Sequence, residues 1–334
     1  MTDYGHELAE ESLRKLERRF SLIYSQAERE MREKQRKALE NFEKERSQRL
    51  KALDDSDEQA VKIYKDWLER ETMTNDWLSD MVDELSMKAT QSNELAMEAL
   101  HDTIPGVYAE NANYAAFSID NAIHRDTGFT LIDADTIRNL VMTSGSEATH
   151  GGLLPELTFP KIDRPKDYRW NRQKFHQAIT QGILQGESIP NIVKRTDDIF
   201  GRNKAAAFRA ARTATTCAEN SGRVSSYERA ERIGIELKQE WLAALDSRTR
   251  DSHRKLDGEK VDVGEPFESE HGPIRFPGDP QAHPAEVYNC RCTLIADVEG
   301  YRTDGAERWS RLPKGTTYKE WKAGKQPEKE GLNA

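Results

Sequence analysis

Apolar residues return at intervals of three and four along the first fifty residues of the chain. No proline or glycine occurs between Glu7 and Leu53. The repeating apolar positions are Leu13, Leu16, Phe20, Ile23 and Ala27. This spacing places side chains on one face of an α-helix, so a long helix is predicted here. Lys34 and Gln35 then stand where a continuous heptad would have apolar residues, so a long coiled coil is not expected.

A second helical pattern extends from Glu58 to about Leu100. Its expected buried face consists of Val61, Tyr64, Leu68, Leu78, Met81, Val82 and Leu85. Pro105 and Gly106 are predicted to end this helix, because proline lacks the backbone N–H and clashes with the preceding turn. Residues 1–105 are therefore predicted to form a long-helix region, and the apolar stripes of its helices are expected to dock onto a partner protein. Pairing of the two long helices with each other as a hairpin within the chain is the alternative.

The middle of the chain is predicted to consist of shorter helices joined by turns. Residues 106–168 form a connector with a turn at Gly128 and several glycines and prolines between residues 145 and 165. Helical spacing returns in residues 169–234. We expect helices at Trp170–Gln185, Ile189–Phe200 and Lys204–Arg232, with breaks at Gly186 and Gly201.

The apolar spacing changes to a period of two after Gly234. Apolar and charged residues alternate from Ile235 to Trp241, as a half-buried strand requires. Short runs of similar character follow at Lys260–Val263, Ile274–Phe276 and Cys290–Val298. Since glycine, proline and aspartate turns separate these runs, a small antiparallel sheet is predicted.

Residues 235–312 are thus expected to form a separate module, and residues 313–334 a polar tail. In the tail, Tyr318 and Trp321 are expected to hold one short helix against the body, and the last residues to be disordered. The predicted fold class is α+β, with mostly long helices in the N-terminal half and a small antiparallel-sheet-containing module in the C-terminal part.

Composition agrees with long, solvated helices. The chain has 334 residues, of which 36% are hydrophobic and 33% are charged. An apolar run of about 18 residues, as a membrane span needs, is absent from the sequence. The first twenty residues also lack the apolar region of a secretory signal. We therefore expect synthesis in the cytoplasm and no membrane partner.

Charge is distributed unevenly along the chain. The net charge of -9 means that the molecule as a whole repels DNA. Between Gly201 and Arg232, however, seven Lys or Arg residues stand against three Glu. A solvated helix face is one interpretation of this local charge, and phosphate contact is the other. The candidate DNA-contacting residues are Arg202, Lys204, Arg209, Arg212 and Arg223.

The segment from Trp241 to Gly258 is rich in residue types that carry chemistry. Asp246 follows the predicted strand and can cap the amides two and three residues further on. Gly258 can supply the positive φ that ends a short helical run. If this run is helical, Thr249, Arg250 and His253 share one face.

Cysteine and histidine side chains raise the question of a metal ion. Three cysteines are too few for a disulfide framework, so thiols or metal ligands remain. Candidate zinc ligands are His253, His283, Cys290 and Cys292. In an extended strand the two thiols of the last pair would lie about 6.5 Å apart, too far for one ion without a local bend. We therefore expect no cofactor and a packed structural cluster, in which Asp246 pairs with Arg250 or Arg291.

Several motifs together resemble the phage Mu F-like head-morphogenesis family. They are Trp241, Asp246-x-Arg248-Thr249-Arg250-x-x-His253, Leu256-Asp257-Gly258, Phe276-Pro277-x-Asp279-Pro280 and Asn289-Cys290-Arg291-Cys292. The preceding Ala211-Arg212-Thr213-Ala214 and Ala218-Glu219-Asn220-x-Gly222-Arg223 are similar to the helix that leads into that module. The resemblance covers about residues 205–298. Many members carry Cys-x-x-Cys where this chain has Arg250 and His253, so a thiolate-rich metal site is not implied.

This resemblance implies a minor head protein of a tailed bacteriophage. Such a protein is present in few copies, associates with the portal protein at the portal vertex and is packaged inside the capsid. Expected partners are the portal protein, the major capsid or scaffold protein, and packaged double-stranded DNA. The expected location is the virion, after assembly in the host cytoplasm.

Two other functions are alternatives to that of a minor head protein. A metal-dependent hydrolase or nuclease would use Asp246, His253 and Asp257 with Cys290 or His283. The sequence contains no His-Glu-x-x-His, phosphate loop or Gly-x-Ser-x-Gly elbow, so we expect a protein that is not an enzyme and has no catalytic residues. A DNA-binding module is the other alternative, and the net acidity makes that activity secondary.

Overall fold

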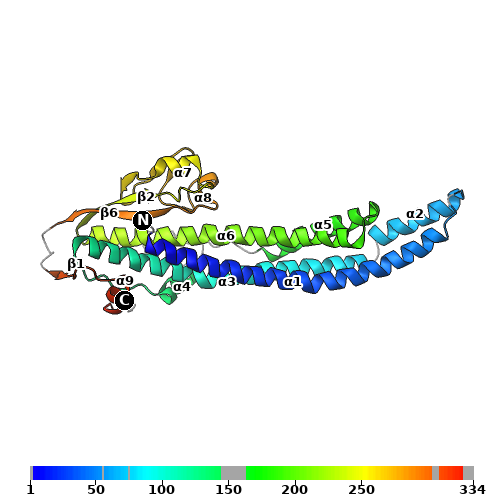
Figure 1. Ribbon diagram of the computed structural model, residues 1–334, viewed down its shortest axis with the longest axis horizontal. Coiled ribbons are helices and arrows are strands. Elements are labelled where there is room, and N and C mark those ends of the chain that lie inside the picture. Colours follow the sequence, from blue (N-terminus) through cyan, green and yellow to red (C-terminus); the bar gives the residue numbers. More distant parts are fainter. Residues whose placement is uncertain (1–2, 55, 74–75, 144–162, 303–307, 326–334) are drawn as a thin grey trace. The chain divides into compact units, whose positions relative to one another are not determined.

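The chain divides into two compact units, each assembled from separated stretches of sequence. The computed structural model describes residues 3–54, 56–73, 76–143, 163–302 and 308–325. The helical unit comprises Arg18–Glu98 and Lys161–Phe208. The sheet unit comprises Met1–Glu17, Ala99–Pro160 and Arg209–Ala334. Figure 1 shows the elements of both units coloured along the sequence.

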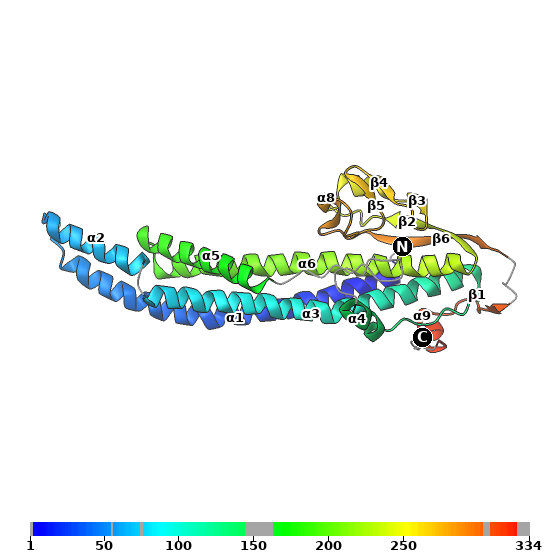
Figure 2. The ribbon, with the colours of Figure 1, turned by 180° about the vertical axis from the view of Figure 1, so that it is seen from behind.

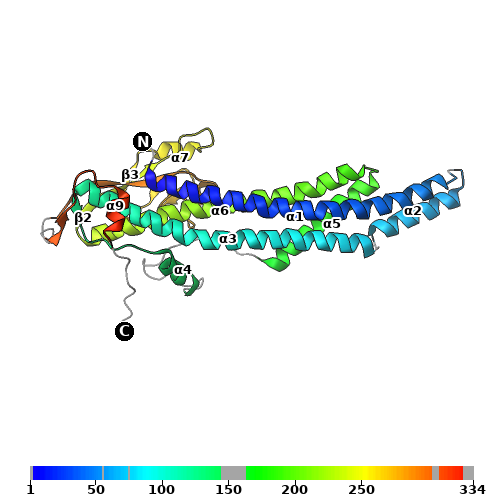
Figure 3. The ribbon, with the colours of Figure 1, turned by 60° about the horizontal axis from the view of Figure 1, so that its bottom comes forward.

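The helical unit is built from helices packed lengthwise (Figures 1 and 3). The helices α1 (Tyr4–Lys51), α3 (Asp76–Ile123) and α6 (Ile189–Arg232) continue into the sheet unit, whereas α2 (Glu58–Met73) and α5 (Arg164–Leu184) do not.

The apolar stripe of α1 is covered within the chain itself. Phe20 and Leu39 are at most 2% exposed. Phe42 stacks on both Trp67 and Trp77, with ring centroids 5.8 and 5.3 Å apart. The predicted first helix with a buried face is therefore confirmed, but its stripe does not need a partner protein to cover it.

A row of polar side chains crosses the core of the helical unit. Hydrogen bonds run from Tyr24 to Asn93 (2.6 Å), from Asn93 to Asn203 (3.1 Å), from Asn203 to Asn171 (2.9 Å) and from Asn171 to Thr90 (3.1 Å). The row joins α1, α3, α5 and α6, and each link satisfies polar atoms that would otherwise be buried without a partner.

Gln35 shows why the apolar stripe of α1 weakens in the middle. Its side chain is 3% exposed and accepts a hydrogen bond of 2.9 Å from the hydroxyl of Thr196. The polar position is thus an internal contact between α1 and α6, and burial continues beyond it at Leu39.

The predicted helix end at Pro105 is wrong. A single helix, α3, runs from Asp76 to Ile123 with Pro105 inside it. Proline in a helix interior costs about 3 kcal/mol. Ile104 is fully buried and Tyr108 is 4% exposed, so packing on both sides of the proline offsets this cost. The helix expected from Glu58 to Leu100 is instead two helices, because α2 ends at Met73.

The predicted break at Gly201 is also wrong, whereas the one at Gly186 is confirmed. Gly186 has a φ of +67° and lies between α5 and α6. Gly201 lies inside the continuous helix α6. A glycine there costs only about 1 kcal/mol relative to alanine, and the neighbouring Phe200 is 2% exposed and packs in the core.

The sheet unit contains a three-stranded antiparallel sheet in the order β3-β2-β6. The central strand β2 (Ile235–Leu242) pairs along its length with β6 (Thr293–Tyr301) and over part of it with β3 (Lys260–Asp262). Every second residue of β2 is buried, as its alternating sequence predicts. The sheet lies against the last part of α6 (Figure 2), so the predicted α+β fold class is confirmed.

Short elements complete the sheet unit. Strand β4 (Phe267–Ser269) forms a hairpin with β5 (Gly272–Ile274), and β1 (Arg125–Asp126) pairs with β7 (Ser310–Arg311). The short helices are α4 (Ala134–Thr143), α7 (Asp251–Leu256), α8 (Pro284–Val287) and α9 (Tyr318–Ala323). In α9 both Tyr318 and Trp321 are buried, which confirms the predicted anchored helix in the tail.

The last two predicted strands have wrong boundaries. The run expected at Ile274–Phe276 is a strand only up to Ile274, and its partner β4 was not expected. The run expected from Cys290 begins as a strand only at Thr293, because Asn289 has a φ of +57° and the chain turns there.

Two predictions fall largely outside the described residues. They concern the connector rich in glycine and proline at residues 145–165 and the disordered end of the tail. Across the described part of the chain, none of the helices is both long enough and apolar enough to span a membrane.

Candidate functional site

Three side chains of α6 hold the start of β6. The Oδ1 of Asn220 accepts from the backbone N–H of Leu294 at 2.8 Å, and Nη1 of Arg223 donates to the carbonyl of Leu294 at 2.8 Å. Oε1 of Glu219 accepts from the hydroxyl of Thr293 at 2.6 Å. All five residues are at most 2% exposed, so α6 fixes the strand through buried and directional contacts.

Two glycines allow backbones to approach α6 closely. A Cβ on Gly222 would lie 2.5 Å from the carbonyl oxygen of Tyr108 in α3. One on Gly278 would lie 2.7 Å from the backbone nitrogen of Cys217, and Gly278 has a φ of +84°. Both positions therefore require glycine. The amide of Asn220 also donates to the carbonyl of Pro277 at 3.2 Å, which holds this turn against α6.

A buried cluster of charges lies beside these contacts. Arg223 donates to the carboxylate of Asp3 and lies 3.5 Å from that of Glu219. Burial opposes the charge of Arg223, but Asp3 and Glu219 outweigh it and raise the pKa of its guanidinium. Nδ1 of His6 lies 2.9 Å from Oε1 of Glu219, and this carboxylate raises the pKa of His6 to about 9 against the effect of burial.

Trp241 and His253 fill the centre of the C-terminal module. Trp241 is fully buried and His253 is 1% exposed. Their rings meet edge to face with centroids 5.2 Å apart, and Phe267 packs on Trp241 at 5.3 Å. The imidazole of His253 is therefore held in one place by aromatic neighbours.

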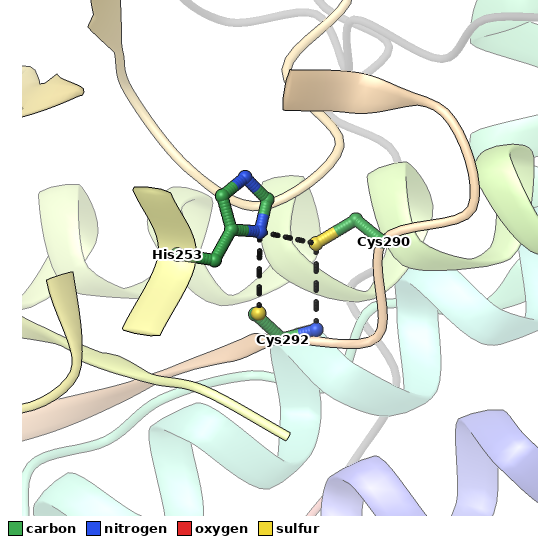
Figure 4. A group of neighbouring side chains, drawn as sticks. All are labelled: His253, Cys290 and Cys292. Carbon is green, nitrogen blue, oxygen red and sulfur yellow. Dashed lines mark hydrogen bonds between the residues drawn. The ribbon is translucent and has the colours of Figure 1, made fainter. Parts of the chain in front are cut away.

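Both thiols of the Cys290-Arg291-Cys292 sequence face the same nitrogen of His253 (Figure 4). Nδ1 lies 3.5 Å from Sγ of Cys290 and 3.5 Å from Sγ of Cys292. The pKa of Cys292 is lowered, mainly by a hydrogen bond from Cys290 and to a smaller extent by the contact with His253. The pKa of Cys290 is raised well above its usual value by its contact with Cys292 and by burial. These three side chains are the group that can hold a metal ion among the described residues.

Glu286 lies on the other side of the imidazole. Its Oε2 is 2.8 Å from Nε2 of His253, without the alignment of a hydrogen bond. The same carboxylate accepts from the hydroxyls of Ser252 at 2.9 Å and Ser269 at 3.0 Å. Burial acts to raise the pKa of Glu286, but these bonds and the neighbouring histidines lower it. A carboxylate at Nε2 favours the tautomer with Nδ1 unprotonated.

Asp246 pairs with Arg291 through two hydrogen bonds. Nε of Arg291 donates to Oδ2 at 3.0 Å and Nη2 donates to Oδ1 at 2.7 Å. Asp246 also accepts from the amide of Arg248 and from the hydroxyl of Thr249. These contacts hold the pKa of Asp246 far below its usual range, Arg291 being the largest cause. The Asp246 side chain is 37% exposed, however, so the pair lies at the surface and not in a buried network.

The predicted shared face of Thr249, Arg250 and His253 is not formed. Helix α7 begins at Asp251, so the first two residues precede it. Arg250 donates instead to the carbonyl of Tyr288, while His253 points into the core. The short helix starts later than expected because the Asp246 side chain stabilises a turn before it.

Four other motif residues have structural contacts. Asp257 accepts from the amide of Ala243 at 2.8 Å, and Gly258 has the expected positive φ, +79°. Asp279 is 2% exposed and accepts two side-chain hydrogen bonds from Arg275, at 3.0 and 2.6 Å. The fourth is Pro277, whose carbonyl oxygen binds α6 as described above.

His283 stands apart from the other zinc candidates. Its Nδ1 accepts from the amide of Ala285 and so caps α8. Its ring packs against His271 with centroids 5.3 Å apart. The structure thus brings together three of the four candidate ligands and leaves His283 out.

The candidate DNA-contacting residues fall into two groups. Arg223 is buried in the charge cluster, and Arg212 pairs with Glu10 at 3.0 Å and Glu17 at 3.3 Å. The expected phosphate contact is wrong for Arg223, because its guanidinium is enclosed. For Arg212, the two neighbouring carboxylates compete with a phosphate for the guanidinium. The remaining three candidates are exposed or half-buried: Arg202, Lys204 and Arg209.

Sequence reasoning missed several residues that build this site. Glu219 and Glu286 are 2% and 1% exposed, yet acidic residues on a helical pattern are normally assigned to the solvent. Asp3 and His6 lie some two hundred residues from their partners, so local spacing contains no sign of them. The polar Asn220 beside Gly222 was the one available signal, because both stand in a motif and neither suits a helix interior.

Comparison with known proteins relates this site to a described family. Residues 173–295 match the family described as Phage Mu protein F like protein. This range contains all of α6, the strand β2 and the start of β6, and so includes both the α6 contacts with β6 and the His253 cluster.

Three relatives are similar over different lengths. The minor head protein GP7 of Bacillus phage SPP1 is 29% identical over 259 residues, which are 75% of this chain and 79% of that protein. The NAD(+)–arginine ADP-ribosyltransferase EFV of Enterococcus faecalis is 28% identical over 242 residues, 69% of this chain but 46% of that protein. An uncharacterized protein of Haemophilus influenzae is 28% identical over 122 residues, 36% of this chain and 24% of that protein. No solved structure matches this chain.

Proposed function

We propose that this chain is a minor head protein of a tailed phage, with a structural role in the head, because residues 173–295 match the Mu F-like family. The observation that carries this proposal is the similarity to GP7, which extends along most of both chains. The site agrees with it, since the family motifs make contacts that hold helix, strand and turn together.

The finer proposal concerns place and partners. We assign the protein to the capsid interior near the portal vertex, in few copies, with the portal protein as its main partner and the major capsid or scaffold protein as neighbours. Purified heads test the location. Intact heads should contain the chain and protect it from added protease, and opened heads should expose it. Heads that lack the chain altogether would contradict the proposal.

The helical unit is the proposed docking surface for the portal. Its apolar stripes are buried within the chain, so docking has to use apolar residues that remain exposed. Leu50 at 43% and Ile63 at 58% belong to the helical unit, whereas Leu245 at 54% and Tyr288 at 60% belong to the sheet unit. The four residues provide matched variants of the full chain.

Co-expression with the portal protein tests this assignment. Leu50→Glu and Ile63→Glu should reduce the number of chains retained per portal, because a charge in an apolar contact is costly to desolvate. Leu245→Glu and Tyr288→Glu should retain the number found without substitution. The opposite result would place the docking surface on the sheet unit.

DNA contact is proposed as a secondary activity of α6. Arg202, Lys204 and Arg209 supply local positive charge in a chain of net charge -9. Binding to double-stranded DNA should weaken as salt increases, and replacing all three residues by Gln should lower the salt dependence. Binding that is unchanged in this variant would remove α6 from the proposal.

We propose further that the chain is not an enzyme. His253 and Cys290 are at most 2% exposed, so a hydrolase substrate would reach them only if the module opened. Asp246 lies at the surface, but both of its carboxylate oxygens accept from Arg291. The match to the ADP-ribosyltransferase leaves more than half of that protein uncovered. Assays for nuclease activity and for nicotinamide release from NAD with an arginine acceptor should give blank values; activity proportional to protein would overturn this.

A further inference from the structure

We propose that His253, Cys290 and Cys292 together bind a zinc ion. The nitrogen and the two sulfur atoms lie within 4.8 Å of one another, and all three residues are buried. They come from two separate parts of the chain, α7 and the segment that leads into β6. In Figure 4 both sulfur atoms face the same ring nitrogen.

The distances are those of ligands around one zinc ion. With Zn–S near 2.3 Å and Zn–N near 2.05 Å, a tetrahedral arrangement separates a nitrogen and a sulfur ligand by about 3.5 Å. The two Nδ1–Sγ distances are 3.5 Å and 3.5 Å. Both nitrogen–sulfur distances therefore match those of ligands on one zinc ion, and the two sulfurs lie within 4.8 Å of each other.

Hydrogen bonding alone accounts for one of these contacts but not for both. An S–H···N bond has a similar length, yet an unprotonated Nδ1 has one lone pair in the ring plane and accepts one thiol proton. The second sulfur at the same distance can share a proton with the other thiol, but not with this nitrogen. An ion bound to all three atoms explains both distances.

The obstacle raised by the strand spacing is absent from the structure. Cys290 and Cys292 precede β6, and the positive φ of Asn289 bends the chain before them. The amide of Cys292 points back to Sγ of Cys290 at 3.4 Å. Such an N–H contact stabilises a metal-bound thiolate, and the bend brings both sulfurs to one side.

Charge and surroundings also suit the ion. Two thiolates and neutral imidazole balance the two positive charges of Zn²⁺, so the assembled site is neutral and its burial is not penalised as an isolated charge would be. Glu286 places a carboxylate oxygen 2.8 Å from Nε2 of His253, on the side of the ring away from the sulfurs. Asn220 Nδ2, at 3.4 Å from the carbonyl of Cys292, fixes the second cysteine from α6. Zinc takes four ligands, and these side chains supply three of them.

Metal analysis of the full chain tests the proposal. Protein purified without chelators and dialysed against zinc, then against buffer, should retain one zinc ion per chain by mass spectrometry. The double variant C290S/C292S should retain none. Cys217→Ser is the matched control, because Cys217 is equally buried but outside the cluster, and it should retain zinc like the original chain.

A spectroscopic measurement does not depend on how the variants fold. Zinc-edge X-ray absorption of the unsubstituted protein should show two sulfur ligands, with nitrogen or oxygen completing the shell. Absence of retained zinc, or a shell of nitrogen and oxygen only, would overturn the proposal. Either result would leave the structural role in the phage head untouched, since that role rests on the relatives.

Discussion

The helical unit and the sheet unit are stabilised by different kinds of core contact. The helical unit buries apolar stripes and one row of neutral polar groups from Tyr24 to Thr90. The sheet unit buries charges, with Arg223 between Asp3 and Glu219, in addition to the cysteine and histidine cluster. The polar contacts buried in the helical unit therefore join neutral groups, whereas those buried in the sheet unit join a cation to carboxylates.

This difference predicts how the two units respond to substitution. Removing a neutral partner leaves a polar atom without a hydrogen bond, whereas removing a charged partner leaves a buried charge, which costs more. The following predictions use the full chain, with unfolding followed by circular dichroism in denaturant.

The largest loss of stability is expected for Arg223→Ala. It leaves Asp3 without its arginine partner and Glu219 with His6 alone, which should lower the free energy of unfolding by about 3 to 5 kcal/mol. Arg212→Ala is the control on the same helix, and its ion pairs with Glu10 and Glu17, which solvent still reaches, should account for about 1 kcal/mol or less. Equal losses for the two variants would show that the charge cluster is not special.

A smaller loss is expected for Asn171→Ala in the helical unit. The substitution removes the middle of the polar row and leaves Thr90 and Asn203 each with one contact fewer, at a cost of about 1 to 3 kcal/mol. Asn191→Ala, at an exposed position of α6, should change stability by about 0.5 kcal/mol or less. A loss for Asn171→Ala as large as that for Arg223→Ala would remove the contrast between the units.

The sheet unit should also lose stability at alkaline pH through His6. Its pKa is raised to about 9 in the folded chain from an ordinary value of 6.5, so folding favours the protonated form. This contribution is complete below pH 6.5 and is lost as the pH rises through about 9, on the order of 1 to 2 kcal/mol. His6→Gln should abolish that part of the pH dependence, and an unchanged profile in the variant would exclude His6 as its source.

The smallest effect is expected for Asp246→Ala. Because its carboxylate is more than a third exposed, loss of the pair with Arg291 should cost about 1 kcal/mol or less. The folded-state pKa is lowered, so this contribution is present above the ordinary carboxyl pKa and is lost as the pH falls below it. A loss comparable to that of Arg223→Ala would mean that the pair is effectively buried.

The sequence predicted best where many residues share one periodic pattern. The stripe of α1 and the alternation of β2 each depend on several positions, so no single residue decides the outcome. Pro105 and Gly201 were misjudged because a local cost of one to a few kcal/mol is offset by packing that only the folded chain contains. Local rules therefore gave the helices but misplaced their ends.

The site was predictable in its residues and not in its contacts. The motif from Asp246 to Cys292 was identified from residue types, and its pairing with Arg291 was one of two alternatives. The contacts of His253 with both thiols depend on the bend at Asn289 and on α6, and neither could be predicted from the spacing of residues in a strand. Arg223 was assigned to DNA because its carboxylate partners stand elsewhere in the sequence or on the next helical turn.

The contact between Asp3 and Arg223 spans 220 residues and therefore bears on the order of folding during synthesis. The helical unit needs the chain only up to Phe208, whereas the sheet unit also needs the strands that follow. Closing so long a loop is slow and entropically costly, and it rewards the chain only once the distant partner has emerged. During synthesis, the carboxylate of Asp3 therefore stays in solvent until Arg223 has been made, after the last residue of the helical unit.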